Sequence, residues 1–249
     1  MDDPAEVRLL EELCFNAWPA LTTALVDGWV VRLSDGHTRR ANSASALWPS
    51  RIAPEALVET VEGLFAARNL TPLFRLTVLA DPAVEPLLRG RGWREEDPSI
   101  GMVADLAEAS PAAPDVALSA RLEASWIDGA MAAYGMGEKG AASLRRMLPN
   151  ITPKHVYATA HDENGAAVGW GLAVAERGHV GLYDLVVAAP ARGRGHGARM
   201  IAALTGWGRS QGARRAYLQV REGNAGARAL YRRLGFRDAY RYIQLRASA

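Results

Sequence analysis

The fold is decided by the stretch Arg192-Gly193-Arg194-Gly195-His196-Gly197. An apolar run, residues 181–188, precedes it, and residues 198–211 follow it with apolar side chains near the 3.6-residue period of a helix. We therefore expect the glycines at a strand-to-helix turn. The first turn of a helix has unpaired N–H groups and a partial positive charge, and glycines let a ligand approach that backbone closely. This pattern is typical of a cradle for phosphate or pyrophosphate.

Other interpretations of the glycine-rich turn are also open. On spacing alone, a flexible loop between two elements is equally compatible. A P-loop is excluded because no Lys-Ser or Lys-Thr pair follows the glycines. A dinucleotide-binding turn is excluded because its glycines follow the different spacing Gly-x-Gly-x-x-Gly. The choice is therefore between a plain loop and a phosphate cradle of another kind.

This stretch resembles the acyl-CoA loop of the GNAT superfamily of N-acetyltransferases, in which Arg-x-x-Gly-x-Gly follows a strand ending in Leu-x-Val-x-x-Pro. A second block is similar to the later superfamily pattern Asn-x-x-Ala-x-x-Leu-Tyr-x-x-x-Gly-Phe. That block consists of Asn224, Ala227, Leu230-Tyr231 and Leu234-Gly235-Phe236. Two blocks in the right order are more specific than either alone. The resemblance covers residues 115–249 and implies an α/β fold, a mixed sheet flanked by helices.

The resemblance also implies how acetyl-CoA is held. Backbone amides of the glycine-rich loop would bind its pyrophosphate, and backbone groups of the preceding strand would pair with its pantetheine arm and polarise the thioester. Asn224 would donate or accept a hydrogen bond with the same arm, although this residue is nearly as well explained as a helix N-cap. The implied cosubstrate-binding residues are Leu185, Val186, Val187, Arg192, Gly193, Arg194, Gly195, His196, Gly197, Ala198, Asn224, Ala227 and Tyr231.

Acetyl transfer to an amine also needs an acid and a base. By the resemblance, Tyr231 is the acid, because a phenol with an ordinary pKa of about 10 can protonate a leaving thiolate. The alternative is a tyrosine that packs on its helix face. The base stays open: Asp184 is one candidate, Glu222, His179 or a chain of water molecules are others, and each side chain also has a structural explanation.

The acceptor pocket is expected beside the strand that contains Tyr183 and the helices that follow residue 119. Residues 38–43 of the first half are a further candidate segment for this pocket. Core packing is the alternative role for each aromatic candidate. The candidate acceptor-binding residues are Trp126, Tyr134, Met136, Trp170 and Tyr183.

An internal repeat divides the chain. Residues 74–93 and 217–236 share the order strand, helix and Gly-aromatic, at the same separation. We therefore predict two tandem GNAT-like halves, 1–108 and 115–249, joined by a linker rich in Ala, Ser and Pro. The first half has no Arg-x-x-Gly-x-Gly loop, and Leu88 stands where Tyr231 stands in the second. The first half is thus expected to be degenerate and structural, and the second to bind acetyl-CoA.

Composition narrows the class of protein. Of the 249 residues 49% are hydrophobic, which is enough for a core. The single cysteine, Cys14, excludes an internal disulfide, and the five histidines show no ligand spacing, so we expect no metal. The acidic N-terminus lacks the apolar segment of a signal peptide, and no stretch approaches 18 apolar residues. We therefore expect a cytoplasmic protein without a membrane span.

Charge is distributed unevenly along the sequence. From residue 190 onward there are 13 arginines and two acidic residues, a net charge of +11, whereas the rest of the chain carries −9. Such a basic segment needs an anionic partner or an acidic neighbour. Acetyl-CoA, nucleic acid and the acidic part of the chain itself are the three options.

Three functions follow from these observations. The leading one is an N-acetyltransferase that transfers the acetyl group of acetyl-CoA to a primary amine of a small molecule or peptide by direct attack in a ternary complex. The others are a non-catalytic acyl-CoA-binding protein and a nucleic-acid-binding module that uses the basic segment. Nucleic acid ranks last because the arginines match no nucleic-acid-binding motif. We expect a monomer or a homodimer.

Overall fold

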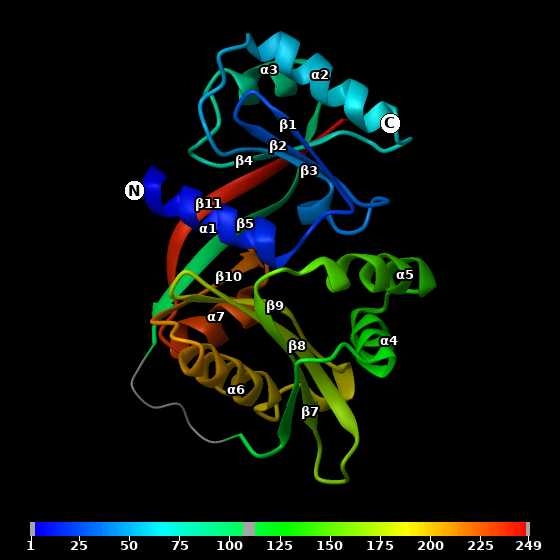
Figure 1. The fold of residues 1–249 in the computed structure, drawn as a ribbon, viewed down its shortest axis with the longest axis vertical. Helices are drawn as coiled ribbons and strands as arrows, with labels where there is room; N and C mark the ends of the chain where they lie inside the picture. The colour runs from blue at the N-terminus through cyan, green and yellow to red at the C-terminus, as the bar shows by residue number, and fades with distance from the viewer. Residues whose placement is uncertain (1–2, 107–112, 248–249) are drawn as a thin grey trace. The chain divides into compact units, whose positions relative to one another are not determined.

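The computed structural model describes residues 3–106 and 113–247 (Figure 1). The chain divides into two compact units. Unit 1 comprises Met1–Gly101, Val220–Ala225 and Asp238–Ala249, and unit 2 comprises Met102–Gln219 and Gly226–Arg237. The central residues of the predicted linker, 107–112, lie outside the described part of the chain. The halves 1–108 and 115–249 stay a prediction.

Unit 1 is built on a sheet whose strand order is β1-β2-β3-β4-β11-β5. Strands β1 to β3 are antiparallel, β3 and β4 are parallel, and β11 pairs antiparallel with β4, with Ile243 opposite Leu76. Helix α2 makes the crossover that a parallel pair requires. The elements are α1 (Pro4–Ala17), β1 (Thr22–Val26), β2 (Trp29–Leu33), β3 (Ser43–Ala46), α2 (Pro54–Ala66), β4 (Leu73–Leu76), α3 (Val84–Gly90), β5 (Arg94–Asp105) and β11 (Arg237–Arg246).

Unit 2 has the strand order β5-β10-β9-β8-β7-β6, because β5 contributes residues to both units. Strands β6 to β9 are antiparallel, and β9 and β10 are parallel. The elements are β6 (Val116–Ser119), α4 (Ala124–Tyr134), α5 (Glu138–Met147), β7 (Lys154–His161), β8 (Ala167–Glu176), β9 (His179–Val187), α6 (His196–Ser210), β10 (Arg215–Arg221) and α7 (Ala225–Arg233).

The same sequence of elements occurs in both units. Three antiparallel strands lead into a helical crossover, a parallel strand and a short helix: β1-β2-β3-α2-β4-α3 in unit 1 and β7-β8-β9-α6-β10-α7 in unit 2. The predicted mixed α/β sheet flanked by helices is confirmed. The repeated order supports the interpretation of the chain as a duplication.

Helices α4 and α6 cover opposite faces of the sheet in unit 2 (Figure 1). A Cβ on Gly169 would lie 3.1 Å from the side chain of Met200 on α6, and a Cβ on Gly129 of α4 would lie 2.3 Å from the Trp170 ring. Since Gly169 and Trp170 are neighbours on β8, their side chains point to opposite faces. Glycines at these positions let both helices pack closely on the strand.

A buried ion pair lies beneath α1 in unit 1. Arg75 and Glu11 are 2% and 0% exposed and form two hydrogen bonds, one of them 2.8 Å long. The Tyr240 hydroxyl also donates to Glu11, and the Arg75 guanidinium lies 3.7 Å from the ring centroid of Tyr242. Both tyrosines belong to β11, so the C-terminal strand completes the core of unit 1. Such a pair is costly to break, because the remaining charge stays buried without a partner.

The sequence pattern does not reveal the two edge strands, β1 and β6. The first of the helices expected after residue 119 begins at Ala124, because Val116–Ser119 forms β6, with Val116 opposite Ala160 of β7. Three of the four β6 residues are exposed, so no hydrophobic alternation marks this strand. Its backbone pairing with β7 fixes it instead.

Candidate functional site

Strands β9 and β10 separate within unit 2. Their parallel pairing runs from His179 opposite Arg215 to Leu182 opposite Leu218 and ends there. On its other side β9 stays paired with β8 as far as Val187. Among the described residues, β9 thus pairs with β10 only as far as Leu182, while its pairing with β8 continues to Val187. A strand edge of this kind can accept an extended ligand that pairs as an additional strand.

A β-bulge lies in this part of β9. Tyr183 is opposite Leu172 and Val186 is opposite Trp170, so two residues of β9 face one residue of β8. Asp184, one of the two, has a positive φ of 47°. The bulge turns the backbone of residues 184–185 just where the pairing with β10 has ended. Asp184, a predicted base, is half-buried there.

The glycine-rich loop leads from β9 into α6. Gly193 and Gly195 have φ values of 77° and 84°, which favour glycine. Gly195 is the N-cap of α6, and no side chain caps the helix. The Arg192 Nε atom donates to the carbonyl oxygen of Val187 at 3.0 Å and fixes the end of the strand. The expected strand-to-helix turn is confirmed, with helix N–H groups available for an anion.

The loop's residues differ in exposure. Arg192, Gly193, Arg194 and Gly195 are exposed, whereas His196 is buried. A Cβ on Gly193 would meet no atom within 4 Å. The loop therefore presents backbone and two arginines to solvent, and its chemistry fits a pyrophosphate. His196 would contribute through its backbone, since its side chain is buried.

Helix α7 packs against the beginning of α6. Leu230 Cδ2 lies 3.3 Å from the position of a Cβ on Gly197. Tyr231, the next residue, is 8% exposed, and its ring lies 6.0 Å from that of Phe236. Burial raises the pKa of Tyr231 to about 12. Its acid role and its packing role stay compatible, because the ring is packed while the helix borders the loop.

Two further candidates lie at the beginning of α7. Asn224 is exposed and directly precedes the helix, and its N–H donates to the carbonyl of Arg221 at 2.9 Å. Ala227 is half-buried. Of the further base candidates, His179 Nδ1 lies 2.8 Å from the Arg177 carbonyl, and Glu222 accepts from Arg241 at 3.1 Å. These contacts agree with the structural explanation for both side chains.

Most acceptor-pocket candidates lie in the core of unit 2. Trp126 donates from Nε1 to the Ala158 carbonyl at 2.9 Å, and Trp170 is buried against α4. The Tyr183 hydroxyl donates to that of Tyr217 at 2.8 Å, and both tyrosines are buried. These contacts favour the core-packing alternative for the three residues.

Two further acceptor-pocket candidates lie at the surface. Tyr134 and Met136 are 43% and 41% exposed, at and just beyond the end of α4. The candidate segment 38–43 belongs to unit 1, where Thr38 Oγ1 accepts from Trp18 Nε1 at 3.0 Å. Sequence analysis did not name Tyr217 as a candidate; its ring occupies the space left by Gly181, which lies opposite it in the register of β9 and β10.

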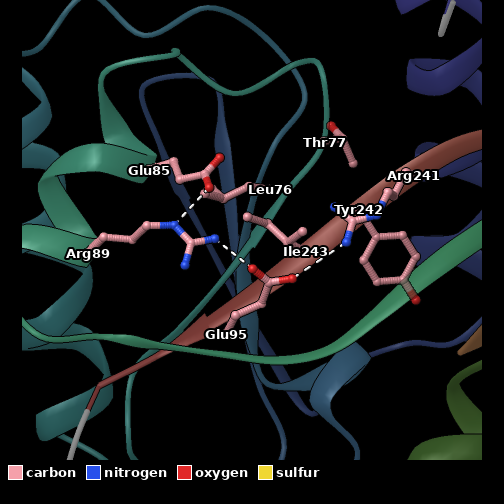
Figure 2. A pocket seen from close by; sticks show the side chains of 8 residues that line it. All are labelled: Leu76, Thr77, Glu85, Arg89, Glu95, Arg241, Tyr242 and Ile243. Atoms are coloured by element: carbon pink, nitrogen blue, oxygen red, sulfur yellow. Dashed lines mark hydrogen bonds and ion pairs between the residues drawn. The ribbon is translucent and has the colours of Figure 1, made fainter. Parts of the chain in front are cut away.

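Unit 1 contains a pocket of about 210 Å³ between β4, α3, β5 and β11 (Figure 2). Its charged side chains pair with one another. Arg89 donates to Glu85 at 2.9 Å and to Glu95 at 2.6 Å, and Arg241 lies 3.5 Å from Glu95. Because both arginines are already paired with carboxylates, the pocket presents no uncompensated charge to a ligand.

The basic C-terminal segment is partly neutralised within each unit. Its arginines pair with acidic residues from earlier in the chain, which is the third option raised by the charge distribution. These pairs are Arg199–Asp115, Arg215–Asp105, Arg221–Asp97, Arg241–Glu95 and Arg246–Glu96. Among the described residues no group of three or more His, Cys, Asp or Glu side chains is placed to hold a metal ion. None of the described helices has the length and apolarity needed to cross a membrane.

Comparison with known proteins identifies the family. The family model described as "Probable histone acetyltransferase Rv0428c C-terminal" matches residues 4–244. The chain belongs to this family. Membership in the Rv0428c C-terminal family confirms the GNAT resemblance and supports N-acetyltransferase, hence acyltransferase, activity.

Proteins similar to this member of the Rv0428c C-terminal family are also described as N-acetyltransferases or GNAT proteins. The uncharacterized N-acetyltransferase YobR of Bacillus subtilis (strain 168) is 26% identical over 242 residues, 95% of each chain. A GCN5-related N-acetyltransferase from Kribbella flavida has the same fold, with a TM-score of 0.68 at 19% identity over 100% of this chain and 97% of that one. A tandem GNAT protein from the clavulanic acid biosynthesis pathway has a TM-score of 0.66 at 16% identity, covering 96% and 87%.

Proposed function

We propose that the protein transfers the acetyl group of acetyl-CoA to a primary amine of a small molecule or peptide, by direct attack in a ternary complex. One observation carries the proposal. The pairing of β9 with β10 ends at Leu182 and Leu218, and the glycine-rich turn into α6 follows directly after β9. A strand edge that has left its parallel neighbour and leads to a helix N-terminus suits a ligand with an extended polar arm and a pyrophosphate.

The residues of this site divide the task. Backbone N–H groups of residues 193–198 hold the pyrophosphate, with Arg192 and Arg194 adding positive charge. Backbone groups of Leu185, Val186 and Val187 pair with the pantetheine arm. The turned backbone at the bulge directs an N–H group at the thioester oxygen, where negative charge develops during attack.

Tyr231 supplies the proton to the leaving sulfur. The amine nitrogen forms a bond to the carbonyl carbon, the C–S bond breaks, and the thiolate takes the phenolic proton. With its pKa raised to about 12 by burial, the Tyr231 hydroxyl stays protonated over the whole working pH range. The proton lost by the amine passes to Asp184 or to water.

The first half is proposed to bind no acetyl-CoA. Its loop between β3 and α2 has no glycine, and a carboxylate of the chain already occupies the loop's donors. The N–H groups of Arg51 and Ile52 donate to Asp27, the latter at 3.0 Å. These bonds lower the pKa of Asp27 to about 2. Leu88, buried in α3, also has no proton to give.

The proposal is tested by incubating the full-length protein with acetyl-CoA and a panel of primary amines while free thiol is measured. We expect amine-dependent thiol release and, by mass spectrometry, an acceptor heavier by one acetyl group. Binding of acetyl-CoA without thiol release for any amine would favour the non-catalytic alternative. Release without amine would indicate hydrolysis and contradict direct transfer.

A further inference from the structure

The side chain of Arg199, next to the glycine-rich loop, forms hydrogen bonds with three separate groups. Arg199, in the first turn of α6, donates from Nε to Asp115 Oδ2 at 2.7 Å, from Nη1 to the carbonyl of Arg194 at 3.2 Å, and from Nη2 to Nδ1 of His196 at 3.0 Å. Two of these acceptors belong to the loop itself. The third, Asp115, directly precedes β6 and lies 84 residues away in sequence.

We propose that Arg199 and Asp115 are positioning residues that hold the glycine-rich loop in its anion-binding shape, and that Arg199 is not a phosphate ligand. This inference rests on the proposed acetyl-CoA site and deepens it. The planar guanidinium presents donors in a fixed fork, so it can join a carboxylate, a ring nitrogen and a carbonyl at once.

The environment of Asp115 fits this role. Its side chain is 28% exposed, and its carboxylate faces both Arg199 and, at 3.8 Å, His196 Nδ1. Burial is the largest influence and acts to raise the pKa of Asp115, but the hydrogen bonds that the carboxylate accepts and its electrostatic interactions with Arg199 and His196 together outweigh burial and lower the pKa below its ordinary value. Asp115 is therefore an anion, and its ion pair with Arg199, whose side chain is 38% exposed, holds the guanidinium beside Arg194 and His196 of the loop.

The glycines of the loop are adapted to the same contact. A Cβ on Gly195 would lie 2.8 Å from Nη1 of Arg199. Gly195 thus leaves the space through which the guanidinium reaches the carbonyl of Arg194. Because Arg199 donates a hydrogen bond to that carbonyl, the peptide N–H groups of the loop keep a common direction, as an anion site requires.

The proposal makes a prediction whose sign is opposite to that of simple electrostatics. Asp115→Asn removes a negative charge close to a site for an anionic ligand. Charge alone predicts that acetyl-CoA binds this variant more tightly. We call the contact of Asp115 and Arg199 with the loop the brace. A weaker brace predicts weaker binding, by about tenfold, because the neutral amide oxygen of Asn replaces a charged acceptor for Arg199.

The experiment compares full-length wild type, Asp115→Asn, Arg199→Lys and the control Asp128→Asn. Asp128 forms a similar but exposed ion pair with Arg145, at 2.7 Å, away from the loop. We measure the Kd for acetyl-CoA by calorimetry, together with KM, kcat and the melting temperature. Asp115→Asn and Arg199→Lys are each expected to raise Kd and KM about tenfold with kcat nearly unchanged, and the control is expected to match wild type.

Other results would contradict either the positioning role of Asp115 and Arg199 or the proposed function itself. An unchanged or lower Kd in Asp115→Asn overturns the brace, and so does Arg199→Lys with wild-type affinity, because lysine keeps the charge but not the fork. A lower kcat and melting temperature at constant KM would show a merely structural role. If wild type itself binds no acetyl-CoA, the proposed function fails, whereas normal wild-type binding with unaffected variants rejects the brace alone.

Discussion

Replacing Tyr231 with phenylalanine separates the proposed acid role from packing. The change removes only the hydroxyl and leaves the ring beside Phe236, at a centroid distance of 6.0 Å. Among the residues that the structure describes, none forms a hydrogen bond with this hydroxyl. Its removal should therefore change the free energy of unfolding by less than about 1 kcal/mol.

The effect on turnover should be far larger. A positioned proton donor contributes about 10² to 10⁴ in rate, which corresponds to roughly 3–5 kcal/mol of activation free energy. Because burial raises the pKa of Tyr231 to about 12, the hydroxyl is protonated throughout the assay range. The ratio of wild-type to variant kcat should thus stay constant from about pH 6 to about pH 10.

The assay measures kcat by thiol release, Kd for acetyl-CoA by calorimetry and stability by thermal unfolding. Tyr157→Phe is the matched control, because burial likewise raises the pKa of Tyr157 to about 12, yet this residue lies on β7 against Trp126. Wild-type turnover in Tyr231→Phe would refute the acid role. Loss of binding with normal kcat would assign the residue to packing.

Four further predictions concern the rest of the chain. Gly195→Glu should abolish acetyl-CoA binding by calorimetry, whereas Gly212→Glu, with a similar positive φ at the other end of α6, should bind normally; equal loss in both would point to strain alone. Glu11→Gln should lower the free energy of unfolding by about 3–5 kcal/mol in urea titrations, since a buried arginine loses its partner; a loss below about 1 kcal/mol would contradict this. Residues 113–249 expressed alone should be less stable than the full chain by thermal unfolding, because β11 loses its partner β4; equal stability would refute this. Asp27 has a folded pKa of about 2 against 3.8 ordinarily, so its stabilisation is present above about pH 4 and lost as the pH falls toward 2; Asp27→Asn should flatten acid unfolding in that interval, and an unchanged profile would exclude the contribution.

The loop and its flanking elements were predictable because their signals are local. The glycines with positive φ, the apolar run before them and the helical period after them all lie within residues 181–211. The mixed α/β fold followed from the same blocks. By contrast, the bulge at Asp184 depends on the register between β9 and β8, which no short motif encodes.

Long-range contacts account for the remaining differences. β11 follows α7 in sequence, yet it pairs with β4 of unit 1, where Tyr240 contacts Glu11 from 229 residues away. The contact between Asp115 and Arg199 spans 84 residues. Aromatic candidates such as Trp126 lie in the core because the sheet brings backbone acceptors to them, and a list of residue types cannot predict that.

We propose that each chain binds acetyl-CoA once, at the loop between β9 and α6, and uses it to acetylate an amine. Calorimetric titration of the full-length protein with acetyl-CoA gives the number of sites. We expect a stoichiometry of one per chain that falls to zero in Gly195→Glu and is retained in Gly212→Glu. Two equivalent sites, or binding that survives Gly195→Glu, would contradict it.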